Sequence, residues 1–67
     1  MVLRLTVREV RCLLLLGEGL RNKEIGARLG IAERTVSNTL QSAYRKLGVS
    51  ARQDAVAEFK RNWSETG

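Results

Sequence analysis

The sequence predicts an all-α fold, namely a compact four-helix domain that contains a helix-turn-helix. Proline is absent and β-branched residues are scattered, which favours helices over strands. The 67 residues leave room for one core, because a chain this short buries only about 60% of its unfolded surface. Residues 22–47 hold two amphipathic patterns separated by Gly30, and a short glycine-containing turn between two helices is typical of a helix-turn-helix. We expect residues 1–4 to be a lead-in or linker, residues 5–63 the domain and residues 64–67 a polar tail.

The first helix is predicted over residues 7–18. Thr6 and Glu9 fit a capping box, in which the threonine accepts from a first-turn amide and the glutamate reaches back to the cap. The expected core face comprises Cys12, Leu13, Leu15 and Leu16. The other apolar residues are Val7, Val10 and Leu14, which fall on a second face. A surface helix should be polar there, so we hypothesise that Val10 and Leu14 meet another domain or subunit.

Helices two and three are predicted over residues 23–29 and about 33–47. Asn22 is the expected N-cap of the shorter helix, and Gly30 suits the left-handed residue after it. Ala32 offers the longer helix no side-chain cap, which forgoes about 1 kcal/mol. Gly48 is expected to end that helix.

The fourth helix is predicted over residues 51–63, after a second capping box from Ser50 to Gln53. Its apolar stripe is formed by Val56, Phe59 and Trp63. This stripe either covers the core or pairs with a second copy in a dimer.

Several kinds of site are excluded by composition. Histidine is absent and Cys12 is the lone cysteine, so Cys/His metal sites, an internal disulfide and His-based catalytic triads are ruled out. Cys12 lies in an apolar run and is interpreted as a core residue. No nucleophile–base pair, phosphate loop or dinucleotide fingerprint is recognisable, so we expect neither an enzyme nor a cofactor. No apolar run approaches the roughly 18 residues that a membrane span needs, and no membrane partner is expected.

The net charge of +5 is concentrated around the helix pair. Residues 21–53 carry seven Lys and Arg against two Glu, which leaves +5 there, whereas five basic residues outside this window balance five acidic ones. A basic patch that coincides with a helix-turn-helix is the electrostatic footprint expected for nucleic acid.

The polar face of helix three carries the candidate DNA contacts. Asn and Gln side chains can pair bidentately with adenine and Ser can bond several base edges, so the predicted base contacts are Ser37, Asn38 and Gln41. The residues of this helix suited to phosphates are Arg34, Thr35, Thr39, Arg45 and Lys46. Lys23 stands beside the free amides at the start of helix two, where a phosphate is also favoured.

Five segments of the chain together closely resemble the LuxR/GerE-type DNA-binding domain. They are Leu5-Thr6-x-Arg8-Glu9, Glu18-Gly19-Leu20-x-Asn22-Lys23-Glu24-Ile25, Leu29-Gly30-Ile31, Thr35-Val36-x-Asn38 and Arg45-Lys46-Leu47-Gly48-Val49. The similarity covers about residues 3–60 without gaps.

The resemblance implies a four-helix domain of a bacterial transcription regulator, working in the cytoplasm on two-fold symmetric promoter DNA. Such domains often dimerise through helix four and follow a phosphate-receiving or small-molecule-sensing domain, with RNA polymerase as an additional partner. Carried over by position, Ser37, Asn38 and Gln41 would face bases. The backbone contacts would be Asn22, Lys23, Thr35, Thr39 and Arg45 or Lys46.

The chain departs from the family pattern at several positions. Relatives often have Pro at the Val7 position, Ser or Thr at Ala32, and Lys at Ser37. His or Asn is frequent where this chain has Thr39, and a polar residue where it has Val10. A reading face without that lysine attracts DNA less strongly, and a target sequence cannot be transferred from relatives.

Two other interpretations are kept. A sigma-factor promoter-binding region shares the helix-turn-helix pattern, but such a region ends near the recognition helix, whereas here Val49 to Arg52 opens a fourth helix. The other interpretation is a protein-interaction domain that kept the fold and lost DNA binding. It is kept because helix one is rich in leucine and the reading face lacks a lysine.

Overall fold

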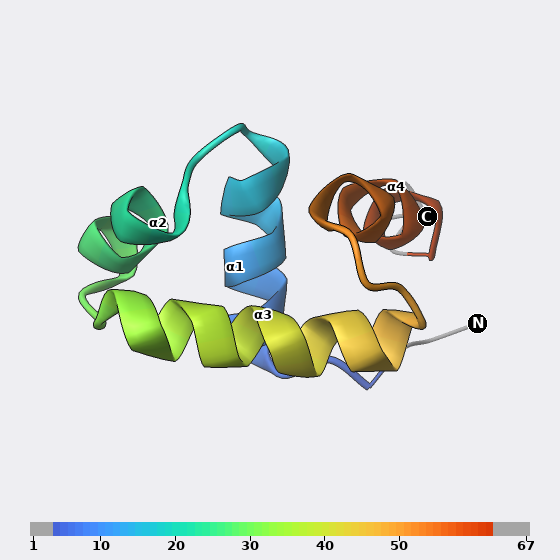
Figure 1. The fold of residues 1–67 in the computed structure, drawn as a ribbon, viewed down its shortest axis with the longest axis horizontal. Coiled ribbons are helices and arrows are strands. Elements are labelled where there is room, and N and C mark those ends of the chain that lie inside the picture. The colour runs from blue at the N-terminus through green and yellow to red at the C-terminus, as the bar shows by residue number, and fades with distance from the viewer. Residues whose placement is uncertain (1–3, 63–67) are drawn as a thin grey trace.

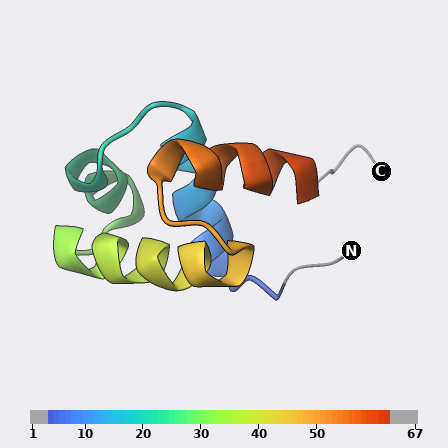
Figure 2. The same ribbon diagram turned by 45° about the vertical axis from the view of Figure 1, so that its right-hand side comes forward.

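A computed structural model of the chain describes residues 4–62. Within this range the chain forms four helices and no strand: α1 (Val7–Gly17), α2 (Asn22–Leu29), α3 (Glu33–Leu47) and α4 (Arg52–Asn62). The predicted all-α four-helix fold is therefore confirmed. Figure 1 and Figure 2 both show α2 and α4 on the same side of the long helix α3, with α1 crossing behind it. None of the helices between residues 4 and 62 is long and apolar enough to cross a membrane.

Helix α1 begins with the predicted capping box. The Glu9 N–H donates to Thr6 Oγ1 at 3.0 Å, and the Thr6 N–H donates to Glu9 Oε1 at 2.8 Å. Two amides that lack a partner inside the helix are thereby satisfied, which stabilises the first turn.

Replacing Thr6 with alanine is expected to destabilise the domain by about 1 kcal/mol, because the first-turn amide loses its side-chain acceptor. Thr6→Ser keeps the hydroxyl and is the matched control. Urea unfolding should give a lower midpoint for the alanine variant and a nearly unchanged one for the serine variant. Equal midpoints for both variants would show that the cap does not contribute.

The helix-turn-helix starts one residue earlier than predicted. Asn22 is the first residue of α2 and not its N-cap; Arg21, in extended conformation, occupies the cap position. The Arg21 N–H donates to Glu24 Oε1 at 2.7 Å, so the glutamate three residues further on sets the start of the helix. At the other end, Gly30 adopts the predicted left-handed conformation, with φ at 73°. The backbone then turns into α3, whose N-cap Ala32 makes no side-chain bond, as expected.

One core lies where α1, α3 and α4 meet, and α2 closes it through Ile25. Its buried residues are Cys12, Leu13, Leu16, Ile25, Val36, Leu40, Ala43, Leu47, Ala55 and Phe59. Leu15, which was predicted to belong to this face, is only half-buried and packs at its edge.

Helix α4 completes the core, which changes how its apolar stripe is understood. Phe59 is 4% exposed and belongs to the core, and Val56 packs half-buried against it. Pairing of this stripe with a second copy stays a prediction. Trp63 lies outside the described residues. The helix begins at Arg52, and the Ala55 N–H donates to the Ala51 carbonyl, so the capping box predicted with Ser50 at the cap does not form in that register.

The second apolar face of α1 is only partly free. Val10 packs half-buried against the core, and its contact with another domain or subunit stays a prediction. Leu14 is 50% exposed and Val7 71% exposed, so these two residues do present apolar surface to solvent.

Candidate nucleic-acid interface

Helix α3 presents one uncovered polar face. Its buried residues recur every three or four positions, which fixes the direction of the core. The opposite face carries four exposed side chains: Arg34, Asn38, Gln41 and Arg45. Figure 1 and Figure 2 show that the side of α3 turned away from α1, α2 and α4 has no helix against it. A row of two amides between two guanidinium groups is therefore free to meet a partner along about three turns of helix.

The hydroxyl residues predicted as DNA contacts lie at the margins of this face. Thr35 and Thr39 are half-buried on one side, and Ser37 is half-buried on the other. Their positions follow from the 100° rotation per residue, which puts these residues between the core direction and the free face. The structure thus brings Asn38 and Gln41 to the centre of the face and leaves Ser37 beside them.

The basic side chains near this face differ in whether they form an ion pair. Arg34 and Arg45 form no ion pair with any residue in the range 4–62, and neither does Lys23 in the first turn of α2. Lys23 is exposed beside amides that lack helical partners, whereas the neighbouring Asn22 is half-buried. These three basic side chains can reach an anion without breaking an existing pair.

Lys46 is held differently from the arginines. Its Nζ donates to Glu9 Oε1 at 2.9 Å, and the Ser42 hydroxyl donates to Glu9 Oε2 at 2.9 Å. Because Oε1 also accepts the Thr6 N–H, one carboxylate joins the start of α1 to two residues of α3. Glu9 is 4% exposed, and its carboxylate accepts hydrogen bonds from Thr6, Ser42 and Lys46.

The environment of Glu9 keeps its carboxyl ionised. Burial by itself raises the pKa of Glu9, but the hydrogen bond from the Thr6 amide, the bonds from Lys46 and Ser42, and the Lys46 charge together outweigh it and lower the pKa below the ordinary value. No buried side-chain oxygen or nitrogen in the described part of the chain lacks a hydrogen-bond partner, so the buried Glu9 carboxylate is satisfied.

Glu9 is the member of this region whose tertiary contacts the sequence analysis missed, since it was assigned only a capping bond. The signal was present in the spacing. Glu9 precedes Cys12, Leu13 and Leu16 by three, four and seven residues, which places it on the buried stripe of α1. A carboxylate on a core stripe requires a partner, and cations or hydroxyls on another helix supply one.

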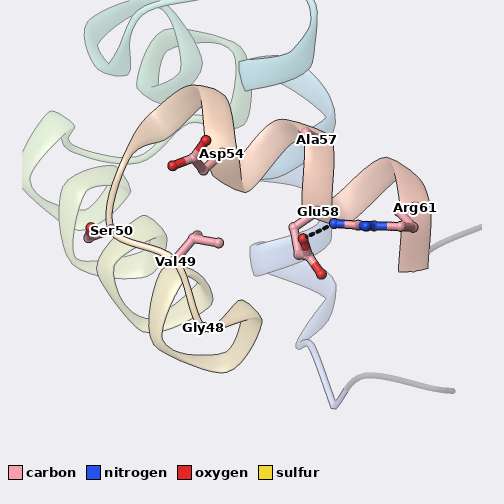
Figure 3. Close-up of a pocket in the computed structure, with 7 residues that line it drawn as sticks. All are labelled: Gly48, Val49, Ser50, Asp54, Ala57, Glu58 and Arg61. Carbon is pink, nitrogen blue, oxygen red and sulfur yellow. Dashed lines mark hydrogen bonds and ion pairs between the residues drawn. The ribbon is translucent and has the colours of Figure 1, made fainter.

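A hollow lies away from this face, between α4 and the turn that precedes it (Figure 3). It is lined by Gly48, Val49, Ser50, Asp54, Ala57, Glu58 and Arg61. Arg61 is turned back onto Glu58 as an ion pair, and Asp54 adds a further carboxylate. Two acids against one basic side chain do not favour a phosphate, so this hollow is no candidate for DNA. Among residues 4–62 no group of three or more His, Cys, Asp or Glu side chains could hold a metal ion.

The chain matches known proteins over nearly its whole length. The family model of the bacterial regulatory proteins of the luxR family matches residues 3–59. The transcriptional regulatory protein YdfI of Bacillus subtilis (strain 168) is 45% identical over 53 residues, which cover 79% of this chain and 25% of that protein. The probable transcriptional regulatory protein SgaR of Hyphomicrobium methylovorum is 49% identical over the same shares of the two chains. The chain therefore spans about a quarter of the length of these relatives.

A solved structure shows the same fold. The transcription factor GerE superposes with a TM-score of 0.80 at 40% identity, covering 85% of each chain. This similarity agrees with the four-helix domain described above. The chain belongs to the LuxR family of bacterial regulatory proteins, a family of DNA-binding transcriptional regulators and not of enzymes.

Proposed function

We propose that this chain binds double-stranded promoter DNA sequence-specifically, with α3 lying in the major groove. The observation that carries the proposal is the uncovered face of α3, on which Asn38 and Gln41 stand between two arginines that form no ion pair within residues 4–62. An α-helix fits the major groove, and amide side chains can pair bidentately with adenine there. Ser37, at the edge of the same face, is the third proposed base contact.

The proposed backbone contacts surround that face. Phosphates are expected against basic side chains, hydroxyls and the start of α2, which gives the set Asn22, Lys23, Arg34, Thr35, Thr39, Arg45 and Lys46. Arg34 and Arg45 lie at opposite ends of the face, so each can reach a phosphate where the helix leaves the groove. Most of the electrostatic attraction then comes from the edges of the site and not from the bases.

The chain is proposed to act as the output domain of a larger regulator in the cytoplasm. The matched segment covers only 25% of each of these relatives, which supports a further regulatory domain, such as the receiver of a response regulator or a ligand sensor. We also propose that the domain binds DNA as a homodimer and that RNA polymerase is a further partner. Leu14 is the exposed apolar residue proposed to contact a second copy or an attached domain.

Base contacts and backbone contacts should respond differently to mutation. Asn38→Ala is expected to lower discrimination between the preferred duplex and one with a single changed base pair by about 1–3 kcal/mol. Lys23→Ala should weaken binding to all duplexes alike and reduce the slope of log K against log[salt] by about 1. Fluorescence anisotropy titrations of both variants on both duplexes measure the two effects. If Asn38→Ala leaves discrimination intact, α3 does not read bases through this residue.

A protein-interaction domain is the second candidate, because Val7 and Leu14 expose apolar surface on α1. Leu14→Lys should then abolish partner binding that persists at high salt, whereas DNA binding at low salt would be absent in the unmodified chain. A sigma-factor region is disfavoured by α4, which contacts both α1 and α3 as an integral part of the fold.

A further inference from the structure

We propose that Glu9 is a positioning residue for DNA binding, which holds the Lys46 ammonium in place to meet a phosphate beside the recognition helix. This inference rests on the proposed DNA binding. It assigns to a residue outside the recognition helix a part in how the helix engages DNA. The juxtaposition that carries it is a nearly buried carboxylate behind a partly exposed ammonium, 2.9 Å apart.

The two partners of the ion pair differ in their exposure to solvent. The Glu9 side chain is 5% exposed and the Lys46 side chain is 36% exposed, so the lysine is the partner that an anion arriving from solvent can reach. A lysine ammonium carries three donors, and the bond to Glu9 uses one of them. An approaching phosphate would therefore meet the remaining donors of Lys46 and be screened from the carboxylate behind it.

The position of Lys46 on α3 fits a backbone contact. Lys46 follows Thr35, Thr39 and Ser42 at helical spacing along the side of α3 next to the free face. When a helix lies in the major groove, the phosphates run along its two sides. This side is the one that Glu9 contacts, through Ser42 as well as Lys46.

Glu9 restrains the Lys46 side chain before DNA binds. Lysine is a point charge on a flexible four-carbon stem, and a free side chain must lose rotamer freedom when it binds a phosphate. The bond to Glu9 removes much of that freedom before DNA arrives, since Glu9 is itself fixed by the Thr6 amide and the Ser42 hydroxyl. The arginines at the ends of the face have no such fixed partner between residues 4 and 62.

A double-mutant cycle on the DNA-binding chain tests the proposal. Lys46→Met should weaken binding to a preferred duplex about fivefold near 0.15 M salt and reduce the salt slope by about 0.9, the loss of one phosphate contact. Glu9→Asp keeps the net charge but is one methylene too short to reach Lys46 in the same geometry. It should weaken binding by a similar factor in the unmodified chain and have no effect in the Lys46→Met background. Ser42→Ala removes one of the two bonds that fix Glu9 but keeps Lys46 and its bond, so it should weaken binding less than Glu9→Asp does and leave the salt slope unchanged.

Two results would overturn the proposal. Unchanged affinity and salt slope in Lys46→Met would show that the ammonium binds only Glu9 and does not contact DNA. An equal effect of Glu9→Asp with and without Lys46 would show that Glu9 acts only through the fold. If Glu9→Asp does not fold, as judged by its thermal unfolding curve, Glu9→Gln takes its place and the same dependence on Lys46 decides. Failure of the unmodified chain to bind any duplex would instead count against the proposed function itself.

Discussion

Gly26→Ala is expected to destabilise the domain severely. A Cβ atom at this position would lie 2.7 Å from the Ile31 carbonyl oxygen, well inside van der Waals contact. That oxygen belongs to the backbone of the turn between α2 and α3, so it cannot move aside as a flexible side chain would. The Ile31 N–H also donates to the Gly26 carbonyl at 2.9 Å, which holds the two segments together. We expect a cost of about 2–3 kcal/mol from the forced shift, even after the better helix propensity of alanine is counted.

Gly17→Ala is the matched control for this prediction. Gly17 is also helical, but a Cβ there would meet Val56 Cγ1 at an ordinary 3.7 Å. This variant should be as stable as the unmodified chain or slightly more stable, because alanine favours the helix. Urea unfolding followed by circular dichroism measures both variants. A Gly26→Ala midpoint equal to that of Gly17→Ala would mean that the turn does not require this close approach.

Glu9→Ala is expected to have the second largest effect, about 2–3 kcal/mol. The substitution removes the acceptor for the Thr6 amide, the Ser42 hydroxyl and the Lys46 ammonium in one step. The cost stays below that of breaking a fully buried ion pair, because Lys46 is partly exposed and can regain water. Glu9→Gln keeps the size and one acceptor oxygen, so it should cost about half as much.

The same residue should make stability depend on pH in the acidic range. The pKa of Glu9 is lower in the folded chain than the ordinary value of 4.5, so the unfolded chain takes up the proton first as the pH falls. The stabilisation by Glu9 is therefore complete above about pH 5.5 and is lost as the pH falls through the folded pKa. The difference in unfolding free energy between the unmodified chain and Glu9→Gln should be constant near neutrality and shrink below the ordinary pKa. A difference that stays constant down to pH 3 would contradict this account.

The helix-turn-helix was predictable because its signals are local. Helix α3 begins and ends where the periodicity predicted, since Gly48 stops it and its buried residues repeat without interruption. The start of α2 was misplaced by one residue because Asn22 has the higher intrinsic cap preference, whereas Glu24 pairs with the backbone amide of Arg21. The hydrogen bond between Glu24 and the Arg21 amide therefore decides the start of the helix, and the cap preference of asparagine does not.

Contacts between distant segments could not be predicted in the same way. Glu9 and Lys46 are 37 positions apart, and the position of either residue in its helix does not predict that the two form an ion pair. The close approach at Gly26 likewise depends on the path of the turn, which the residue types do not fix. For the stripe of α4, the sequence left two alternatives open, and the structure shows that Phe59 is buried in the core, while pairing of the stripe with a second copy stays a prediction. The DNA contacts on α3 remain predictions, although Asn38 and Gln41 are exposed as they require.

Selection of duplexes from a random DNA pool, followed by titration of the best duplex at two salt concentrations, tests the central claim most directly. We predict that selection converges on related sequences. The binding constant should fall steeply between about 50 mM and 200 mM salt, because each neutralised phosphate releases counterions. Asn38→Ala should lose the preference for the selected sequence while keeping most of the salt dependence. If no duplex is bound at about 50 mM salt, or if binding depends on neither salt nor sequence, the assignment of α3 as a DNA-reading helix is contradicted.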